Sequence, residues 1–138
     1  MHDKTIKIII DTNLWISFLI GSKAAFALRN ILTDGKVEIV TTEILRSEIM
    51  AVASRPKFAR HFAPESCERL LGFLHARGVD YPLGDIPQRC RDSKDDYLLE
   101  LARVADADFL ITGDKDLTDL RLFGHCHIMT LAEFCQRL

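Results

Sequence analysis

Short apolar runs recur along this chain, and the first is the clearest. Residues 6–10 read Ile-Lys-Ile-Ile-Ile, which is a brief β-branched run that predicts a buried strand of a parallel sheet. Similar runs predict strands at residues 37–41, 109–112 and 127–130, with a short edge strand at 79–82.

Segments with helical spacing separate these runs. Apolar positions three and four residues apart, together with Pro64 at a helix start and Gly78 at a helix end, predict seven helices. Strands and helices therefore alternate, which favours one α/β domain over residues 1–138, with a three-layer α/β/α fold and a mostly parallel central sheet. The helices are expected at residues 14–19, 24–32, 42–53, 64–77, 94–105, about 117–122 and 131–137.

Composition limits the function classes. The 138 residues are 48% hydrophobic and 28% charged, with a net charge of -2, so binding to nucleic acid would need a local basic patch or a bound metal. The four cysteines form no Cys-x-x-Cys pair, and no apolar stretch is long enough to span a membrane. We therefore expect a cytoplasmic protein with reduced thiols and no membrane partner.

Acidic residues follow two of the predicted strands. Asp11 comes directly after residues 6–10, and Asp114 and Asp116 come just after residues 109–112. In open α/β sheets, ligands bind beyond the carboxyl ends of the strands. These aspartates are therefore placed where a functional site is expected.

Helical phase adds two more carboxylates to this set. Glu48 lies on the same arc as Ile44, Leu45, Ile49 and Val52, and Asp95 leads the apolar face that continues through Leu98 and Leu99. A carboxylate on an apolar face needs a partner. By the same test, Asp96 and Glu100 are expected to face water.

Too little positive charge accompanies these acids. Lys94 and Lys115 each adjoin one of them, but no basic residue accompanies Asp11. Mutual repulsion should raise the pKa of at least one carboxylate, and a bound Mg²⁺ or Mn²⁺ would supply the missing charge. One or two such ions could activate water for attack on a phosphodiester, so no protein nucleophile would be needed.

Four segments, in this order, resemble the motifs of PIN domains. Residues 6–13 are similar to the opening strand and its Asp-Thr-Asn end, and residues 41–49 resemble the second motif. Residues 95–102 resemble the third motif, and 109–117 the fourth. Each match is weak by itself, but the four in sequence cover nearly the whole chain.

The resemblance implies a VapC-like toxin ribonuclease of a toxin–antitoxin system. Such a protein uses Mg²⁺ or Mn²⁺ to cut single-stranded RNA, forms a homodimer and is inhibited by a cognate antitoxin. Asn13 matches the polar residue after the first acid, and Asp116 matches a second, variable acid of the fourth motif. Asp92 or Asp96 could share the role assigned to Asp95. The residues that match the catalytic and metal-binding acids are Asp11, Glu48, Asp95 and Asp114.

Two other function classes stay open at this point. A receiver-type regulatory module also places acids and a lysine at strand ends, but residues 37–41 run into threonines rather than a phosphoacceptor aspartate. A PIN-like fold without catalysis could serve as an RNA- or protein-binding module. The basic stretch Arg55, Lys57, Arg60 and His61 could contact RNA phosphates or a protein partner.

Overall fold

Six strands form the sheet at the centre of the computed structural model, which describes residues 5–89 and 93–137. The strand order is β3-β2-β1-β4-β6-β5, and every neighbouring pair is parallel except β5 with β6. This confirms the predicted mostly parallel α/β sheet. The strands are β1 (Ile6–Ile10), β2 (Val37–Thr41), β3 (Val79–Asp80), β4 (Phe109–Ile111), β5 (Leu122–Phe123) and β6 (Cys126–Met129).

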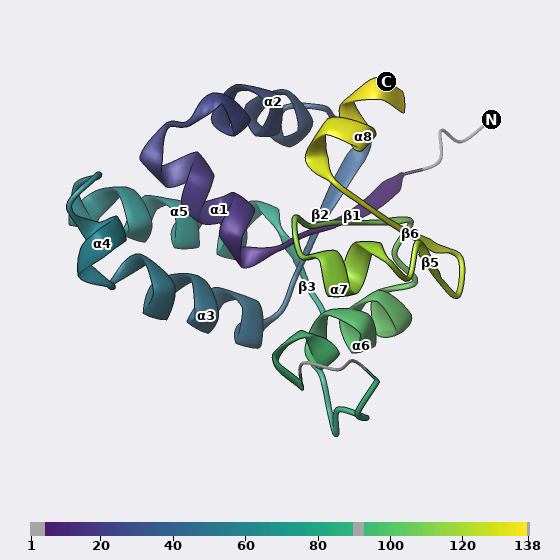
Figure 1. The fold of residues 1–138 in the computed structure, drawn as a ribbon. Coiled ribbons are helices and arrows are strands. Elements are labelled where there is room, and N and C mark those ends of the chain that lie inside the picture. Colours follow the sequence, from purple (N-terminus) through teal and green to yellow (C-terminus); the bar gives the residue numbers. More distant parts are fainter. Residues whose placement is uncertain (1–4, 90–92, 138) are drawn as a thin grey trace.

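Helices cover both faces of this sheet, with α2 and α8 on one side of the strands and α6 on the other (Figure 1). Helix α1 packs against α2 and α3, while α6 packs against β1 and β4. The helices are α1 (Thr12–Ile20), α2 (Lys23–Leu32), α3 (Glu43–Ala53), α4 (Pro56–Ala59), α5 (Pro64–Arg77), α6 (Asp96–Ala105), α7 (Lys115–Thr118) and α8 (Leu131–Arg137), with a 3-10 turn, η1 (Ser93–Asp95), before α6.

The predicted elements differ from the observed ones mainly at the short helices and strands, those of two to four residues. Strands β1 and β2 and helices α5 and α8 have the predicted bounds, whereas α4 and β5 were not predicted. The helix expected near residues 117–122 ends at Thr118, because Arg121 has a φ of 62° and the chain then enters β5. A two-residue turn that begins at Gly124, with a φ of 64°, returns the chain from β5 into β6.

The core lies on both faces of β1. Ile8, Ile9 and Ile10 are each fully buried, although successive strand residues face opposite sides, because β1 is interior to the sheet and helices cover it above and below. Trp15 of α1 and Leu98 of α6 are also buried in this core. Within the described residues, no helix is long and apolar enough to cross a membrane.

Candidate metal-binding acidic site

Two neighbouring strands end side by side at the candidate site. Ile10 of β1 is in register with Ile111 of β4, and the backbone N–H of Asp11 donates to the carbonyl of Ile111 at 3.0 Å. Because β1 and β4 are parallel, the segments that follow them both leave the sheet at its carboxyl edge. Asp11 and Thr112 are thereby adjacent although 101 positions separate them in the sequence.

Asp11 begins helix α1 as its N-cap. Its Oδ1 accepts a hydrogen bond from the Thr12 backbone N–H at 2.7 Å, and its Oδ2 accepts one from the Thr112 hydroxyl at 2.6 Å. Only 8% of the residue is exposed. Two hydrogen bonds at the start of a helix therefore hold a carboxylate that is largely removed from solvent.

Thr112 connects Asp11 to the loop that carries the next acid. Its hydroxyl donates to Asp11 and also accepts from the backbone N–H of Asp114 at 3.0 Å. Asp114 is half-buried and caps α7, since its Oδ1 accepts from the Asp116 N–H at 2.9 Å. Asp116 itself is exposed, whereas the negative charge of the half-buried Asp114 acts on Asp11.

Glu48 reaches the same place from helix α3. Its Oε1 accepts hydrogen bonds from the hydroxyls of Thr12 and Tyr97, the latter at 3.3 Å. Glu48 is half-buried, as its predicted place on the inner arc requires. The prediction that Ile44 shares this inner arc is wrong, because Ile44 is 39% exposed.

Asp95 lies at the junction of η1 and α6 and is half-buried. The helix was expected to begin at residue 94, but the α-helix proper begins at Asp96 with Asp95 in the N-cap position. Tyr97, two residues later, contacts Glu48, so this end of α6 reaches the acidic site. Asp92, the alternative to Asp95, lies outside the described residues.

Asp96 and Glu100 do not face water, so that prediction is wrong. Each is only 4% exposed, because the segment that carries Arg89 lies over this side of α6. Asp96 accepts from the Arg89 backbone N–H at 2.9 Å. Glu100 accepts from the guanidinium groups of Arg89 at 2.8 Å and Arg103 at 2.7 Å. These two acids therefore fasten the loop to α6.

Electrostatics confirm that the acids interact. Burial raises the pKa of Asp11, and the negative charges of Glu48 and Asp114 raise it further, while the hydrogen bonds from Thr112 and Thr12 act in the opposite direction. Burial and the charges of Glu48 and Asp11 also raise the pKa of Tyr97, which keeps its hydroxyl a hydrogen-bond donor. The predicted raised carboxylate pKa is thus found at Asp11.

The donor chemistry of the site fits a hard divalent cation, although no closed cage is present. Among residues 5–89 and 93–137, no three acidic, histidine or cysteine side chains lie close enough to hold a metal ion together. Mg²⁺ usually keeps several waters and is bound by one or two carboxylates, so it needs no such cage. The interacting pair Asp11 and Glu48, with Asp114 alongside, meets that lesser requirement.

Asn13 lies in the first turn of α1 and is exposed, and the capping role at that helix belongs to Asp11. Three hydroxyl groups that were not predicted from the sequence position the acids, those of Thr12, Thr112 and Tyr97. The two threonines carried a signal, since each is next to or near an acid at a strand end. The sequence offered little indication of a role for Tyr97, because an aromatic residue on an apolar helix face is usually part of the hydrophobic core.

The chain is similar to known proteins over most of its length. A family profile described as "PIN domain" matches residues 7–116. MJ1680, an uncharacterized protein of Methanocaldococcus jannaschii, is 29% identical over 124 residues, which cover 88% of this chain and 79% of that protein.

Solved structures show the same fold at low sequence identity. The PIN domain endonuclease Utp24 superposes with a TM-score of 0.55 at 15% identity, covering 88% of this chain and 82% of that one. The PIN domain of human SMG5 gives a TM-score of 0.51 at 11% identity, covering 95% and 97%. At these identities the likeness concerns the fold.

Proposed function

Because this chain belongs to the PIN-domain family, we propose that it is a Mg²⁺- or Mn²⁺-dependent endoribonuclease that hydrolyses phosphodiester bonds of single-stranded RNA. The observation that carries the proposal is the meeting of Asp11 with Glu48 and Asp114 at the carboxyl edge of β1 and β4, where burial and mutual repulsion raise the pKa of Asp11. Such a site gains free energy from binding a cation.

The metal ligands in this proposal come from the start of α1, from α3, from the junction of η1 with α6, and from the start of α7. Asp116, which is exposed at the start of α7, is a further candidate ligand for a second ion. When bound, the metal neutralises phosphate charge and activates water. The proposed ligands are Asp11, Glu48, Asp95 and Asp114, and the same four are the proposed catalytic residues together with Asn13. Because no three acids of the described residues lie close enough to hold one ion together, each ion would be bound by one or two of these carboxylates and by water.

The remaining side chains position these acids. Thr112 holds the Oδ2 of Asp11 and the backbone of Asp114 with a single hydroxyl, so the relative placement of the two acids depends on it. Thr12 and Tyr97 both donate to Oε1 of Glu48, which leaves Oε2 as the oxygen available to a ligand. In this proposal Asn13, which is exposed in the first turn of α1, orients a water or one of the acids.

The biological setting follows from the family resemblance. The four motifs, in their order, support a VapC-like toxin in the cytoplasm, which acts as a homodimer and is inhibited by a cognate antitoxin. These are proposals about partners and assembly, and the biochemical test below does not depend on them.

Cleavage of a labelled single-stranded RNA in Mn²⁺ tests the function. The comparison uses the wild-type protein, the same protein in EDTA, and Asp11→Asn. Asp34→Asn is the matched control, because Asp34 is exposed before β2, at the opposite edge of the sheet, and its one side-chain hydrogen bond, from the Lys36 N–H, can also form to asparagine. We expect cleavage by wild type and Asp34→Asn, and loss of cleavage in EDTA and in Asp11→Asn.

Two results would contradict this proposal. Cleavage that persists in Asp11→Asn would mean that the site is elsewhere. No cleavage of several RNAs by wild type, in conditions where Mn²⁺ binding is measured directly, would favour the alternative of a non-catalytic RNA- or protein-binding module.

A further inference from the structure

The start of α6 is attached to its surroundings on two different faces of the helix. The hydroxyl of Tyr97 donates to Glu48 at 3.3 Å, which ties α6 to the acidic site. Asp96, one residue earlier, accepts from the backbone N–H of Arg89 at 2.9 Å. Successive residues of a helix point in directions about 100° apart, so these two attachments act from different sides. Asp95 directly precedes both residues, and the position of its carboxylate therefore depends on both attachments.

An ion pair with Arg89 reinforces the attachment at Asp96. Glu100 lies four residues after Asp96 and therefore shares its helix face. Its Oε1 accepts from the guanidinium of Arg89 at 2.8 Å, and the Glu100 side chain is only 5% exposed. Arg103 donates to the two carboxylate oxygens of Glu100 at 3.0 and 2.7 Å. Two hydrogen bonds from one planar guanidinium fix the orientation of Glu100, so Arg103 sets the direction in which Glu100 meets Arg89.

The Arg89 side chain is held by a third contact. Its guanidinium lies over the ring of Phe123 in β5, with 5.2 Å to the ring centroid. Burying charged groups costs free energy, and apolar side chains would fasten this segment to α6 without that cost. A planar guanidinium paired with a carboxylate, however, restricts geometry more narrowly than apolar contact does. The arrangement is thus suited to holding the start of α6 in one position.

We propose that Arg89 and Glu100 are positioning residues for Asp95, and that their ion pair sets how tightly the acidic site binds a divalent cation. This inference rests on the proposed function, in which Asp95 is a metal ligand. Arg89 lies six residues before Asp95 and Glu100 lies five residues after it, so the ion pair joins the two flanks of the turn η1 that carries Asp95. Groups that orient a metal ligand contribute to metal affinity without touching the metal.

Two other roles for the ion pair give different results. A pair that only stabilises the fold would change the free energy of unfolding and leave metal affinity unaltered. A pair that acts through charge alone would have effects of opposite sign, because loss of the Arg89 charge favours a bound cation and loss of the Glu100 charge disfavours it. Positioning predicts that both losses weaken cation binding. The sign of the Arg89 effect therefore separates positioning from charge.

The experiment measures Mn²⁺ binding to the full chain by isothermal titration calorimetry at pH 7.5. The variants are Glu100→Gln, Arg89→Met and Arg89→Lys, compared with the wild-type protein and with Asp11→Asn. Circular dichroism at the same temperature identifies the variants that are folded when binding is measured. Arg89→Lys decides the question if Arg89→Met does not fold, because it keeps the charge and loses only the planar guanidinium.

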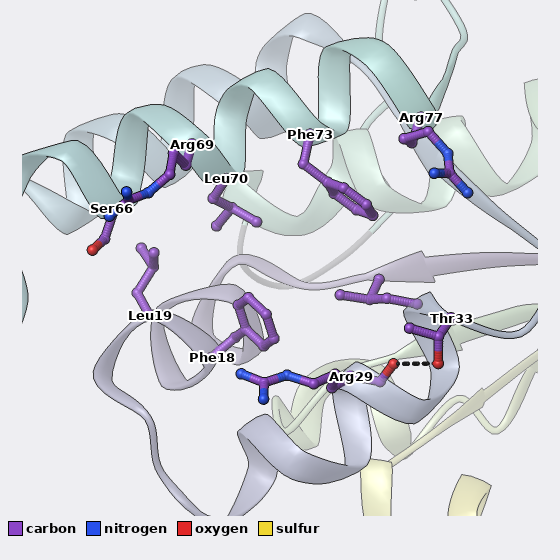
Figure 2. Close-up of a pocket in the computed structure, with 10 residues that line it drawn as sticks. Phe18, Leu19, Arg29, Thr33, Ser66, Arg69, Leu70, Phe73 and Arg77 are labelled. Carbon is purple, nitrogen blue, oxygen red and sulfur yellow. Dashed lines mark hydrogen bonds between the residues drawn. The ribbon is translucent and has the colours of Figure 1, made fainter.

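Two further arginine variants are the controls. Arg46→Met breaks a comparable ion pair, since Arg46 contacts Asp80 at 2.8 Å and its side chain is 19% exposed, against 24% for Arg89. Arg69→Met removes the same charge from an exposed position, at the groove of about 620 Å³ between α1, α2 and α5 (Figure 2). These controls report the effect of losing one ion pair and of losing one positive charge.

We expect Glu100→Gln and Arg89→Met each to weaken Mn²⁺ binding by about five- to ten-fold, near the lower end of the effects known for groups that orient metal ligands. Arg89→Lys should weaken it by about three-fold, whereas charge alone predicts no change. Arg46→Met and Arg69→Met should not weaken binding by more than about two-fold.

A double-mutant cycle tests whether Glu100 acts through Asp95. Asp95→Asn should weaken Mn²⁺ binding about ten-fold in the wild-type background, because it removes a ligand charge. In the Glu100→Gln background, the same substitution should weaken binding by less than about three-fold, because the ligand has already lost its position. Equal effects of Asp95→Asn in the two backgrounds would overturn the proposal.

The remaining results separate this inference from the proposed function. Mn²⁺ binding that is lost in Asp11→Asn but unchanged in Glu100→Gln and Arg89→Met would overturn the positioning role and leave the proposed function in place. Tighter binding in Arg89→Met would assign the pair an effect through charge alone. No binding of Mn²⁺ by the wild-type protein would overturn the proposed function, and this inference with it.

Discussion

Binding of Mn²⁺ should stabilise this protein against heat, and Asp11→Asn should remove that stabilisation. The reason is that Asp11 is buried beside the charges of Glu48 and Asp114, so a cation at this site relieves an unfavourable interaction that exists only in the folded state. An asparagine removes one of the charges that attracts the ion.

The expected size follows from linkage and chain length. A ligand at 100 times its dissociation constant adds about 2.7 kcal/mol to the free energy of unfolding. With an unfolding entropy of roughly 2.1 cal/mol/K per residue, 138 residues give about 0.29 kcal/mol/K, so the melting temperature should rise by about 9 °C. In the Asp11→Asn variant, an amide nitrogen in place of Oδ2 could no longer accept from Thr112, which costs about 1 kcal/mol in the metal-free protein.

The effect should depend on pH in a stated direction. The pKa of Asp11 is raised in the folded protein, so the folded state holds this proton more tightly than the unfolded chain does. The stability of the metal-free protein should therefore fall as the pH rises from about 4 through the raised pKa. Because the metal competes with the same proton, the Mn²⁺-induced shift should be larger at pH 7.5 than at pH 5.

Differential scanning fluorimetry over a Mn²⁺ titration measures these shifts, each variant being compared with its own metal-free sample. Asp34→Asn should keep the full shift, because Asp34 precedes β2 at the other edge of the sheet. The reasoning fails if saturating Mn²⁺ leaves the wild-type melting temperature unchanged, or if Asp11→Asn keeps the wild-type shift.

Two further predictions concern the fold. Gly78→Ala should destabilise the protein by about 1–3 kcal/mol, since a Cβ there would lie 2.5 Å from the Leu74 carbonyl oxygen. Gly72→Ala, in the open middle of α5, should instead stabilise the protein by about 0.5–1 kcal/mol. Urea unfolding at pH 7 compares the two variants, and equal effects would contradict the packing argument. Glu100→Gln should lower the free energy of unfolding by about 1–2 kcal/mol at pH 6, because the hydrogen bonds to Arg89 and Arg103 lose the carboxylate charge. The loss is no larger because Arg103 is mostly exposed and solvent screens its ion pair. These ion pairs lower the pKa of Glu100 to about 2, so their contribution is complete above pH 4.5 and disappears toward pH 2; a difference from wild type that stays constant between pH 6 and pH 3 would contradict this.

Much of the architecture could be predicted because local patterns encode it. The run at residues 6–10 is apolar on both faces, and only an interior strand covered by helices buries both, which is where β1 lies. The end of that run placed Asp11 at the carboxyl edge, and helical phase placed Glu48 toward the interior. The short elements α4 and β5 were missed because two to four residues carry too little periodicity.

The surroundings of the acids could not be predicted, because they depend on contacts between distant segments. Helical phase alone assigned Glu100 to solvent, and only the segment that carries Arg89, which lies over that side of α6, makes it a buried ion-pair partner. In the same way, the Tyr97 hydroxyl meets Glu48 only because α3 and α6 converge on one edge of the sheet.

The sequence by itself determined the longer strands and helices, and which acids stand at their ends, since these depend on spacing within a few turns. Tertiary structure alone decided which hydroxyls hold the acids and which polar side chains are buried. It also brought Phe18 of α1 and Phe73 of α5 together along one groove. The physical reason is that burial and electrostatic partnership are properties of the space between elements, and packing sets that space.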